Sequence, residues 1–379
     1  MAVPDDRPHV LIADDQADVL ESLRLLLGPE GFRTEAVTTP EQVVKRIGQD
    51  GVDLLLMDLN YTRDTTSGAE GLTLIDRIRE IEPLVPIVAM TGWSTVELAV
   101  EAMRKGIRHF VQKPWDNDAL VSLIRDEVEE GRVRRRRARQ QRRELEEARA
   151  VQRSLLPRTL PVVPGLELAV HWEPARGVGG DAFDVVLLGE QQLALSVADV
   201  AGKGIPAALL MSSMQAIVRA HAADGDPAAV CGRVNALLAG QLPDDRFVTF
   251  VLAAYDTATR RLRYCNAGHN PPLLVRPDGG IVRLDAGGPV LGILRNAVYE
   301  AADLTLAPGD RLVLYTDGIV EAGRGDEEFG EARLIDALES GRGCAARELV
   351  GRIVDAVGAF ADDGEERTDD RTVVVLAIE

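Results

Sequence analysis

The sequence has few cysteines, few aromatic residues and no long apolar run. Only Cys231, Cys265 and Cys344 occur among 379 residues, and their wide spacing excludes a disulfide framework and a cysteine-rich zinc site. No apolar stretch is long enough to span a bilayer, and the first residues, MAVPDDRPHV, lack the features of a secretory signal. These absences predict a soluble cytoplasmic protein that contacts no membrane.

Positive charge is also scarce. The chain has 43 lysines and arginines against 61 acidic residues, for a net charge of -18. Proteins that bind nucleic acid generally present a basic surface to the phosphates, so we expect no specific nucleic-acid partner. The run VRRRRARQQRR is an exception. We interpret it as a solvated helix face, with nucleic-acid binding and membrane-surface attraction as its rivals.

The chain is long enough for two domains, and its first part has α/β character. From His9 to about Arg125, strand-like runs (HVLIADD, VDLLLMD, PIVAMT and HFVQKP) alternate with amphipathic helical patterns. This alternation predicts a doubly wound parallel sheet. We therefore expect an α/β domain over residues 1–125.

Polar residues follow each of these runs. They are Asp14, Asp15, Asp58, Thr91 and Lys113. Because the carboxyl ends of parallel strands meet at one edge of a sheet, these groups should converge on one crevice. Carboxylates there suit Mg²⁺, and a carboxylate can also act as a phosphoryl acceptor while a cation neutralises the developing charge. One acid alone would be read as a loop cap, but five such residues indicate a site.

The spacing of these residues resembles the receiver domain of two-component response regulators, with a flavodoxin-like fold. The resemblance implies that Asp58 is phosphorylated by a cognate histidine kinase and that Asp14 and Asp15 hold Mg²⁺ together with Asp58. It also implies that Thr91 and Lys113 contact the phosphoryl group.

Three details accompany this resemblance. Lys113-Pro114 is expected to be a cis peptide. Phe110 stands where the family has an aromatic switch residue, although an ordinary core aromatic is nearly as good a reading. The segment NYTRDTTSGAEG after Asp58 is longer and more polar than the usual loop, and it is either an added contact or an insertion.

Residues 126–157 have the composition of a helical linker. Strong helix formers fill the stretch from Arg132 to Leu156, which contains no glycine or proline. A short coiled-coil-like seam is formed by Leu145, Ala148, Gln152 and Leu155. We predict a signalling helix that pairs with its counterpart in a homodimer.

The remainder, residues 158–379, changes in character. Many short strands with hairpin connections are grouped apart from the helical stretches, of which two lie together after the third strand and a third lies near AARELVGRIVDAVGAFA. Grouped strands and grouped helices predict an α+β domain, a β-sandwich of antiparallel sheets flanked by helices.

Acidic residues stand beside glycines or at strand ends throughout this second part. They are Asp181 in VGGDAFD, Asp199 in VADVAGKG, Asp317 in LYTDG, and Asp369 and Asp370 in TDDRT. Oxygen ligands without cysteine or repeated histidine suit Mg²⁺ or Mn²⁺ rather than zinc. Two such ions can activate a water molecule and clamp a phosphoryl group. The pattern predicts metal-assisted phosphate chemistry, and a metal would relieve the repulsion between adjacent acids.

These motifs, in this order, resemble the PPM/PP2C-type serine/threonine phosphatases of the SpoIIE/RsbU branch. The resemblance implies two Mn²⁺ or Mg²⁺ ions held by Asp181, Asp199, Asp317 and Asp369 as the catalytic acids, with the backbone carbonyl of Val200 as a further ligand. Asp370 is a second candidate, but Asp369 is favoured as the first acid of the D-D-x-T pattern.

Two other residues near these motifs have open roles. His269 in NAGHNPP is an acid catalyst, a phosphate contact or a structural histidine, and we favour the structural role because a metal-activated water does not require histidine. Asp184 is equally well a hydrogen-bonding loop residue or a metal-related one.

The two resemblances together predict a response regulator whose output is protein dephosphorylation. The implied substrate is a phosphorylated STAS-domain anti-sigma factor antagonist. A rival is a non-enzymatic adaptor that binds its partner through a phosphatase-like domain, and loss of the metal acids would favour it. A DNA-binding output would need a basic helix-turn-helix, and the second part is instead acidic and rich in strands.

Overall fold

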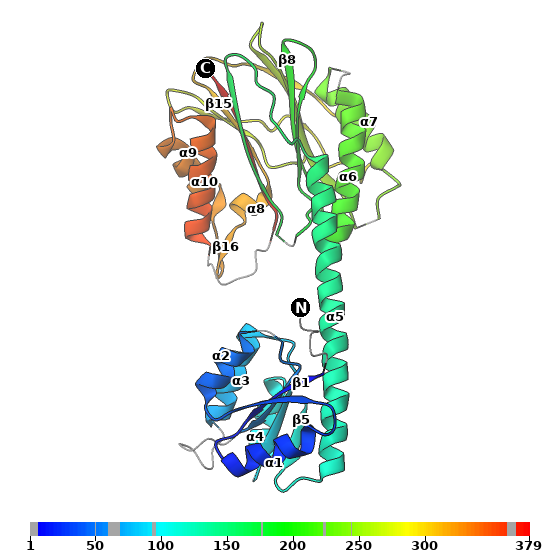
Figure 1. The fold of residues 1–379 in the computed structure, drawn as a ribbon. Coiled ribbons are helices and arrows are strands. Elements are labelled where there is room, and N and C mark those ends of the chain that lie inside the picture. Colours follow the sequence, from blue (N-terminus) through cyan, green and yellow to red (C-terminus); the bar gives the residue numbers. More distant parts are fainter. Residues whose placement is uncertain are drawn as a thin grey trace, which may run out of the picture. The chain divides into compact units, whose positions relative to one another are not determined.

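The protein is described by a computed structural model, shown in Figure 1. It describes residues 7–49, 51–59, 69–92, 96–175, 177–222, 225–243, 245–361 and 369–379. The chain divides into an N-terminal unit, Met1–Arg143, and a C-terminal unit, Glu144–Glu379. The division falls inside the long helix α5 (Asn117–Leu155). The three-part division at residues 125 and 157 therefore stays a prediction.

The N-terminal unit contains a parallel five-stranded sheet in the order β2-β1-β3-β4-β5, and every pair of neighbours is parallel. This is the predicted doubly wound fold. Its strands are β1 (His9–Ala13), β2 (Arg33–Val37), β3 (Leu54–Asp58), β4 (Ile87–Thr91) and β5 (His109–Gln112). Its helices besides α5 are α1 (Ala17–Leu27), α2 (Pro40–Ile47), α3 (Ala69–Ile81) and α4 (Val96–Arg104).

The two faces of this sheet are covered by different helices. Leu11 and Leu55 point to one face and pack with residues of α2, α3 and α4. Val10 and Leu54 point to the other face and pack with α1 and the first turns of α5. Because neighbouring residues of a strand face opposite sides, the central strands must be apolar throughout, which explains their continuous hydrophobic runs.

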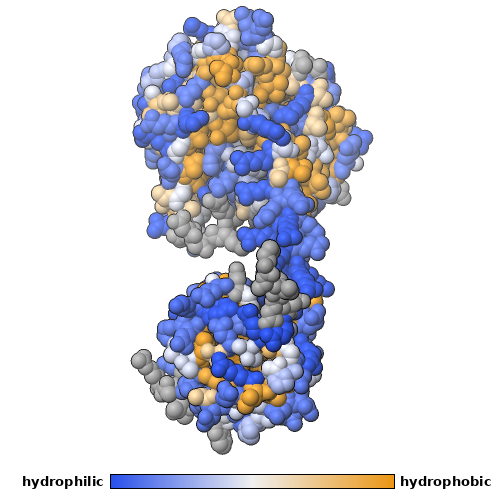
Figure 2. All heavy atoms as spheres, viewed as in Figure 1, coloured by the Kyte–Doolittle hydropathy of each residue, from blue (hydrophilic) through white to orange (hydrophobic). Residues whose placement is uncertain are grey.

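The first half of α5 is anchored to the N-terminal unit by arginines. Arg132 makes a bidentate pair with Asp53, with Nε 3.0 Å from Oδ1 and Nη2 2.9 Å from Oδ2. Arg135 lies 3.9 Å from the same carboxylate and is half-buried. The interpretation as a solvated helix face is therefore wrong for Arg135, within the arginine run, because Asp53 attracts its guanidinium group as it does that of Arg132 just before the run. It is right for Arg136 and Arg137, which are exposed, and Figure 2 shows the visible surface of α5 as largely hydrophilic.

The C-terminal unit contains two sheets that face each other. The first runs β13-β10-β9-β8-β7, with β14 paired to β10, and the second runs β12-β11-β15-β18-β6. Strands of the first are β7 (Ala182–Leu187), β8 (Gln192–Val200), β9 (Val248–Asp256), β10 (Arg261–Ala267), β13 (Gly287–Gly288) and β14 (Ala302–Thr305). Strands of the second are β6 (Leu166–Glu173), β11 (Leu273–Val275), β12 (Ile281–Arg283), β15 (Arg311–Tyr315) and β18 (Arg371–Ile378). A hairpin of β16 (Gly323–Arg324) and β17 (Glu327–Glu328) stands apart.

Helices cover the outer faces of this sandwich, as Figure 1 shows. They are α6 (Gly204–His221) and α7 (Pro227–Leu238) on the first sheet, and α8 (Asp317–Val320), α9 (Gly330–Ser340) and α10 (Ala346–Phe360) on the second. Strand β18 explains the layering. Val374 and Leu376 pack between the sheets, whereas Val373 and Val375 pack against α9 and α10. The predicted sandwich of sheets flanked by helices is thus confirmed.

The predicted seam lies on the part of α5 that belongs to the C-terminal unit. Gln152 is buried, and Leu145, Ala148 and Leu155 are half-buried within the single chain. Part of the apolar stripe is therefore used to attach the helix to its own domain, and the homodimer stays a prediction. In the part of the chain that the structure describes, no helix has the length and apolar character required to cross a membrane.

Candidate phosphorylation and metal sites

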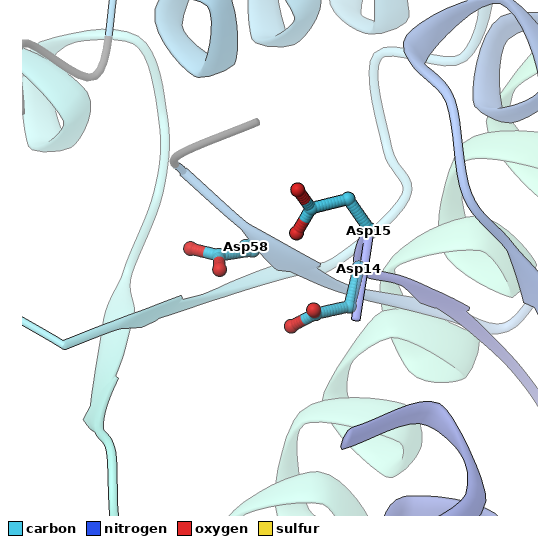
Figure 3. Close-up of side chains that lie close together, drawn as sticks. All are labelled: Asp14, Asp15 and Asp58. Atoms are coloured by element: carbon cyan, nitrogen blue, oxygen red, sulfur yellow. The ribbon is translucent and has the colours of Figure 1, made fainter. Parts of the chain in front are cut away.

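The carboxyl ends of β1 and β3 bring three acids of the N-terminal unit together. Carboxylate oxygens of Asp14, Asp15 and Asp58 all lie within 4.8 Å of one another, and Figure 3 shows the three side chains side by side. Asp14 and Asp58 are buried, whereas Asp15 is only half-buried. Three carboxylate oxygens this close together, one of them on a partly exposed residue, fit a hydrated Mg²⁺ ion.

Lys113 joins two of these acids from the end of β5. Its Nζ lies 2.6 Å from Oδ2 of Asp14 and 2.6 Å from Oδ2 of Asp58. Burial lowers the pKa of Lys113, but the hydrogen bonds to both carboxylates outweigh it and the pKa is raised. Burial raises the pKa of Asp14, against the effect of Lys113. The ammonium group is therefore held charged at the place where phosphoryl charge would develop.

The other predicted residues of this unit stand as follows. Thr91 is buried at the end of β4, next to β5 in the sheet. The Lys113-Pro114 peptide is cis, as predicted. Phe110 is half-buried and packs on the core beside α2, α3 and α4. This position is compatible both with an aromatic switch residue and with an ordinary core aromatic. Residues 60–68 of the segment after Asp58 lie outside the described residues.

Asp181 is the most buried acid among the predicted ligands of the C-terminal unit. It is 1% exposed and precedes β7. Its Oδ2 accepts hydrogen bonds from the hydroxyls of Thr316 (2.7 Å) and Thr372 (2.6 Å). Its Oδ1 is buried and has no hydrogen-bond partner among the described residues. A buried carboxylate oxygen without a donor is costly, and a cation bound to it would remove that cost.

Other acids repel Asp181 and each other. Burial, followed by the charges of Asp199 and Asp370, raises the pKa of Asp181 well above its usual range. Burial, followed by the charges of Asp317 and Asp369, raises the pKa of Asp199 to about 8. The pKa of Asp317, at the start of α8, rises to about 6 through burial and the charge of Asp369. Burial and mutual repulsion make the charged forms of these three carboxyl groups unfavourable. Such a group of acids fits a site for divalent cations, whose charge would offset the repulsion.

The two adjacent acids, Asp369 and Asp370, have different partners. Both oxygens of Asp370 accept backbone N–H groups: Oδ1 from Ala175 at 2.7 Å, and Oδ2 from Gly180 at 2.7 Å and Asp181 at 3.4 Å. Asp369 is half-buried, and its Oδ2 lies 2.8 Å from Nζ of Lys203. Asp370 is thus used to hold the loop before β7, which supports Asp369 as the ligand.

The backbone around Asp181 leaves room for the Val200 carbonyl. A Cβ atom on Gly180 would lie 2.7 Å from the Val200 oxygen and 3.3 Å from Oδ1 of Asp199. Only glycine allows this approach, because any side chain would displace the carbonyl or the acid. The residues present therefore fit the metals that the family resemblance implies.

Asp184 and His269, whose roles the sequence left open, each contact another side chain of the protein. Asp184, on β7, is paired with Arg219 of α6, with Nε 2.5 Å from Oδ2. His269 Nδ1 lies 2.7 Å from the Thr249 hydroxyl, and burial lowers the histidine pKa to about 4. A neutral, buried imidazole at pH 7 is a poor proton donor, which supports a structural role for His269.

Sequence reasoning missed several contributors to this site. Trp172 Nε1 donates to the Asp181 carbonyl at 3.1 Å, and Glu321 adds negative charge that helps to raise the pKa values of Asp199 and Asp317. Thr316 and Thr372, which bind Asp181, belong to the LYTDG and TDDRT motifs, so their proximity to acids in the sequence was a usable signal. Nothing in the sequence connected Trp172 to the acids, because that contact depends on the pairing of distant strands.

Fold and site define the class of this protein: a receiver domain combined with a PP2C-type serine/threonine phosphatase domain. A family model described as stage II sporulation protein E (SpoIIE) matches residues 189–379, and one for the response regulator receiver domain matches residues 10–125. The chain belongs to the SpoIIE family, and its N-terminal unit is a receiver domain.

Individual relatives agree with this assignment. Phosphoserine phosphatase RsbU of Bacillus subtilis is 31% identical over 62% of this chain and 69% of its own length. Protein IcfG of Synechocystis sp. is 29% identical over 68% of this chain. The matched region covers 44% of the length of IcfG. The SiaA-PP2C domain of Pseudomonas aeruginosa superposes with a TM-score of 0.58 at 22% identity, covering 64% of this chain and 98% of that domain, and this likeness concerns the fold alone.

Proposed function

We propose that this protein is a response regulator whose output is the metal-dependent dephosphorylation of phosphoserine or phosphothreonine on a protein substrate. The observation that carries the proposal is the unpartnered, buried Oδ1 of Asp181 among acids whose pKa values are raised by burial and mutual repulsion. The membership of the SpoIIE family and the similarity to a phosphoserine phosphatase support it.

In this proposal Asp181, Asp199, Asp317 and Asp369 hold two Mn²⁺ or Mg²⁺ ions, with the Val200 carbonyl as an additional ligand. When bound, the ions would activate water and neutralise phosphoryl charge. The chain's own residues prepare the site. Thr316 and Thr372 bind one oxygen of Asp181 and leave the other without a donor, so that it would be available to a metal. Lys203, which pairs with Asp369, would place a positive charge beside this ligand.

The receiver domain would control this output. A histidine kinase would transfer a phosphoryl group to Asp58, with Mg²⁺ at Asp14 and Asp15 and with Lys113 neutralising the charge. Phosphorylation would break the present Lys113–Asp58 pair, so the surface around β4 and β5 would change. The helix α5 continues from this domain into the phosphatase domain along the chain, and we propose that it transmits the change, with a homodimer through α5 as part of the device.

We further propose that the substrate is a phosphorylated STAS-domain anti-sigma factor antagonist. The test is Mn²⁺-dependent phosphate release from such a phosphoserine protein, with Asp199→Ala as the inactive variant and Asp336→Ala, an exposed acid on α9, as the matched control. We expect release by the wild type and by Asp336→Ala only, and a changed rate with acetyl phosphate. Binding of the partner without turnover under either metal would refute the proposal in favour of a non-enzymatic adaptor.

A further inference from the structure

The side chain of Gln152, near the end of α5, forms two hydrogen bonds with Gly179. This glycine belongs to residues 177–181, the segment before β7 that ends at Asp181 and is called the metal loop below. Its Nε2 donates to the Gly179 carbonyl at 2.6 Å, and its Oε1 accepts the Gly179 N–H at 3.2 Å. Gln152 is only 3% exposed although it lies on a helix with a highly polar sequence. Burying an amide there is tolerated because both of its polar atoms are satisfied.

Gly179 stands two residues before Asp181, and the intervening backbone is tightly enclosed. A side chain on Gly179 would overlap the Asp370 carboxylate, which accepts the next N–H group, that of Gly180, at 2.7 Å. Gly180 in turn lies against the Val200 carbonyl. A displacement of Gly179 must therefore move Asp181 and the Val200 carbonyl, because the enclosed loop has no free space.

The same helix contacts the loop at a second point. Leu145, two turns before Gln152, lies against Gly177, and the Leu155 carbonyl accepts a hydrogen bond from Gln215 of α6 at 3.2 Å. The end of α5 is thus attached to the metal loop at Gly177 and Gly179 and to α6, which begins just after Val200.

We propose that Gln152 is a positioning residue that sets the affinity of the phosphatase domain for its metals, by holding the Gly179–Asp181 loop on α5. This rests on the proposed function and adds to it the residue through which α5 acts on the metal site. Residues that orient metal ligands typically change metal affinity by about 10- to 100-fold when removed.

The test is a calorimetric titration of the full chain with Mn²⁺, without substrate. All proteins carry Asp15→Asn to weaken the receiver's own metal site. The variant Gln152→Met removes both hydrogen bonds but keeps the side-chain length, and Gln141→Met changes an exposed glutamine of the same helix as the matched control. Thermal unfolding in EDTA measures the stability of each metal-free protein.

We expect Gln152→Met to bind Mn²⁺ about 10-fold or more weakly, and Gln141→Met to bind like the parent. A lower unfolding temperature with unchanged Mn²⁺ affinity would mean that Gln152 only stabilises the domain, and it would overturn the inference. Failure of the parent itself to bind Mn²⁺ at the phosphatase acids would instead refute the proposed metal site, so the two failures are distinguishable. Gln152→Glu serves as a second variant, because it keeps the acceptor for the Gly179 N–H but loses the donor to its carbonyl, and we expect weakened Mn²⁺ binding there too.

Discussion

The hydroxyl of Thr372 donates a hydrogen bond of 2.6 Å to Oδ2 of Asp181, a residue 191 positions earlier in the chain. Thr372 is fully buried on β18, and Asp181 immediately precedes β7 in the opposite sheet. The contact joins the two sheets at the proposed metal site and determines which oxygen of Asp181 remains without a hydrogen-bond donor.

Replacing Thr372 by valine tests this relationship. Thr372→Val keeps the shape but leaves Oδ2 with one donor, so we expect a loss of about 1–3 kcal/mol in the free energy of unfolding. We also expect Mn²⁺ affinity to fall about 10-fold, measured by titration calorimetry. Thr257→Val, at a hydroxyl that donates to the Gln191 carbonyl at 3.1 Å near the surface, is the control. Unchanged Mn²⁺ affinity in Thr372→Val would contradict a role in orienting Asp181.

The raised pKa of Asp199 predicts how metal-free stability depends on pH. This carboxyl group has a pKa of about 8 when folded, against an ordinary value of 3.8. The folded state therefore binds this proton more tightly than the unfolded state does. The stability that the bound proton adds is fully present below the ordinary pKa of 3.8 and is lost as the pH rises through about 8. We expect the unfolding temperature in EDTA to fall between pH 5 and pH 8.5.

Asp199→Asn removes this titration. In EDTA at pH 8 the variant should unfold several degrees higher than the wild type, and Mn²⁺ should raise the unfolding temperature of the wild type much more than that of the variant. Asp336→Asn provides the comparison with an exposed acid. An equal response of wild type and Asp199→Asn to Mn²⁺ would exclude Asp199 as a ligand.

Asp369 and Asp370 should differ when each is changed to asparagine. Asp370→Asn places an amide donor against backbone N–H groups that now bind its oxygens, and we expect a destabilisation of about 1–3 kcal/mol. Asp369→Asn should leave the unfolding free energy nearly unchanged and weaken Mn²⁺ binding. Denaturant unfolding in EDTA and Mn²⁺ titration separate the two effects. Selective loss of Mn²⁺ binding in a stable Asp370→Asn protein would reverse the assignment.

Removal of the Asp58 carboxylate should abolish phosphorylation of the receiver by acetyl phosphate while leaving the domain folded. We expect no hydroxylamine-labile phosphate on Asp58→Asn, and strongly reduced labelling of Lys113→Met, because the ammonium no longer neutralises the incoming charge. Asp76→Asn, which removes the surface partner of Lys105, is the control. Normal labelling of Asp58→Asn would place the phosphoacceptor elsewhere.

Much of the fold and of the candidate sites was predictable from sequence because short-range signals were strong. Continuous apolar runs such as LLLMD require strands buried on both faces, and the polar residues at their ends follow from parallel pairing. The glycines near Asp181, Asp199 and Asp317 likewise mark tight loops around acids in the sequence itself.

The tertiary structure decided what each of these residues does relative to its neighbours. The sequence places Asp369 and Asp370 side by side, and only the order of the D-D-x-T pattern favours Asp369 as the ligand. Strand pairing directs Asp370 to backbone N–H groups of the loop before β7 and leaves Asp369 near Lys203. The stripe on α5 likewise indicated a helix with an apolar side, but only folding placed Gln152 on Gly179. The physical reason is that periodicity and motif spacing report local backbone geometry, whereas the partner of a buried polar atom is selected by packing between segments far apart in the chain.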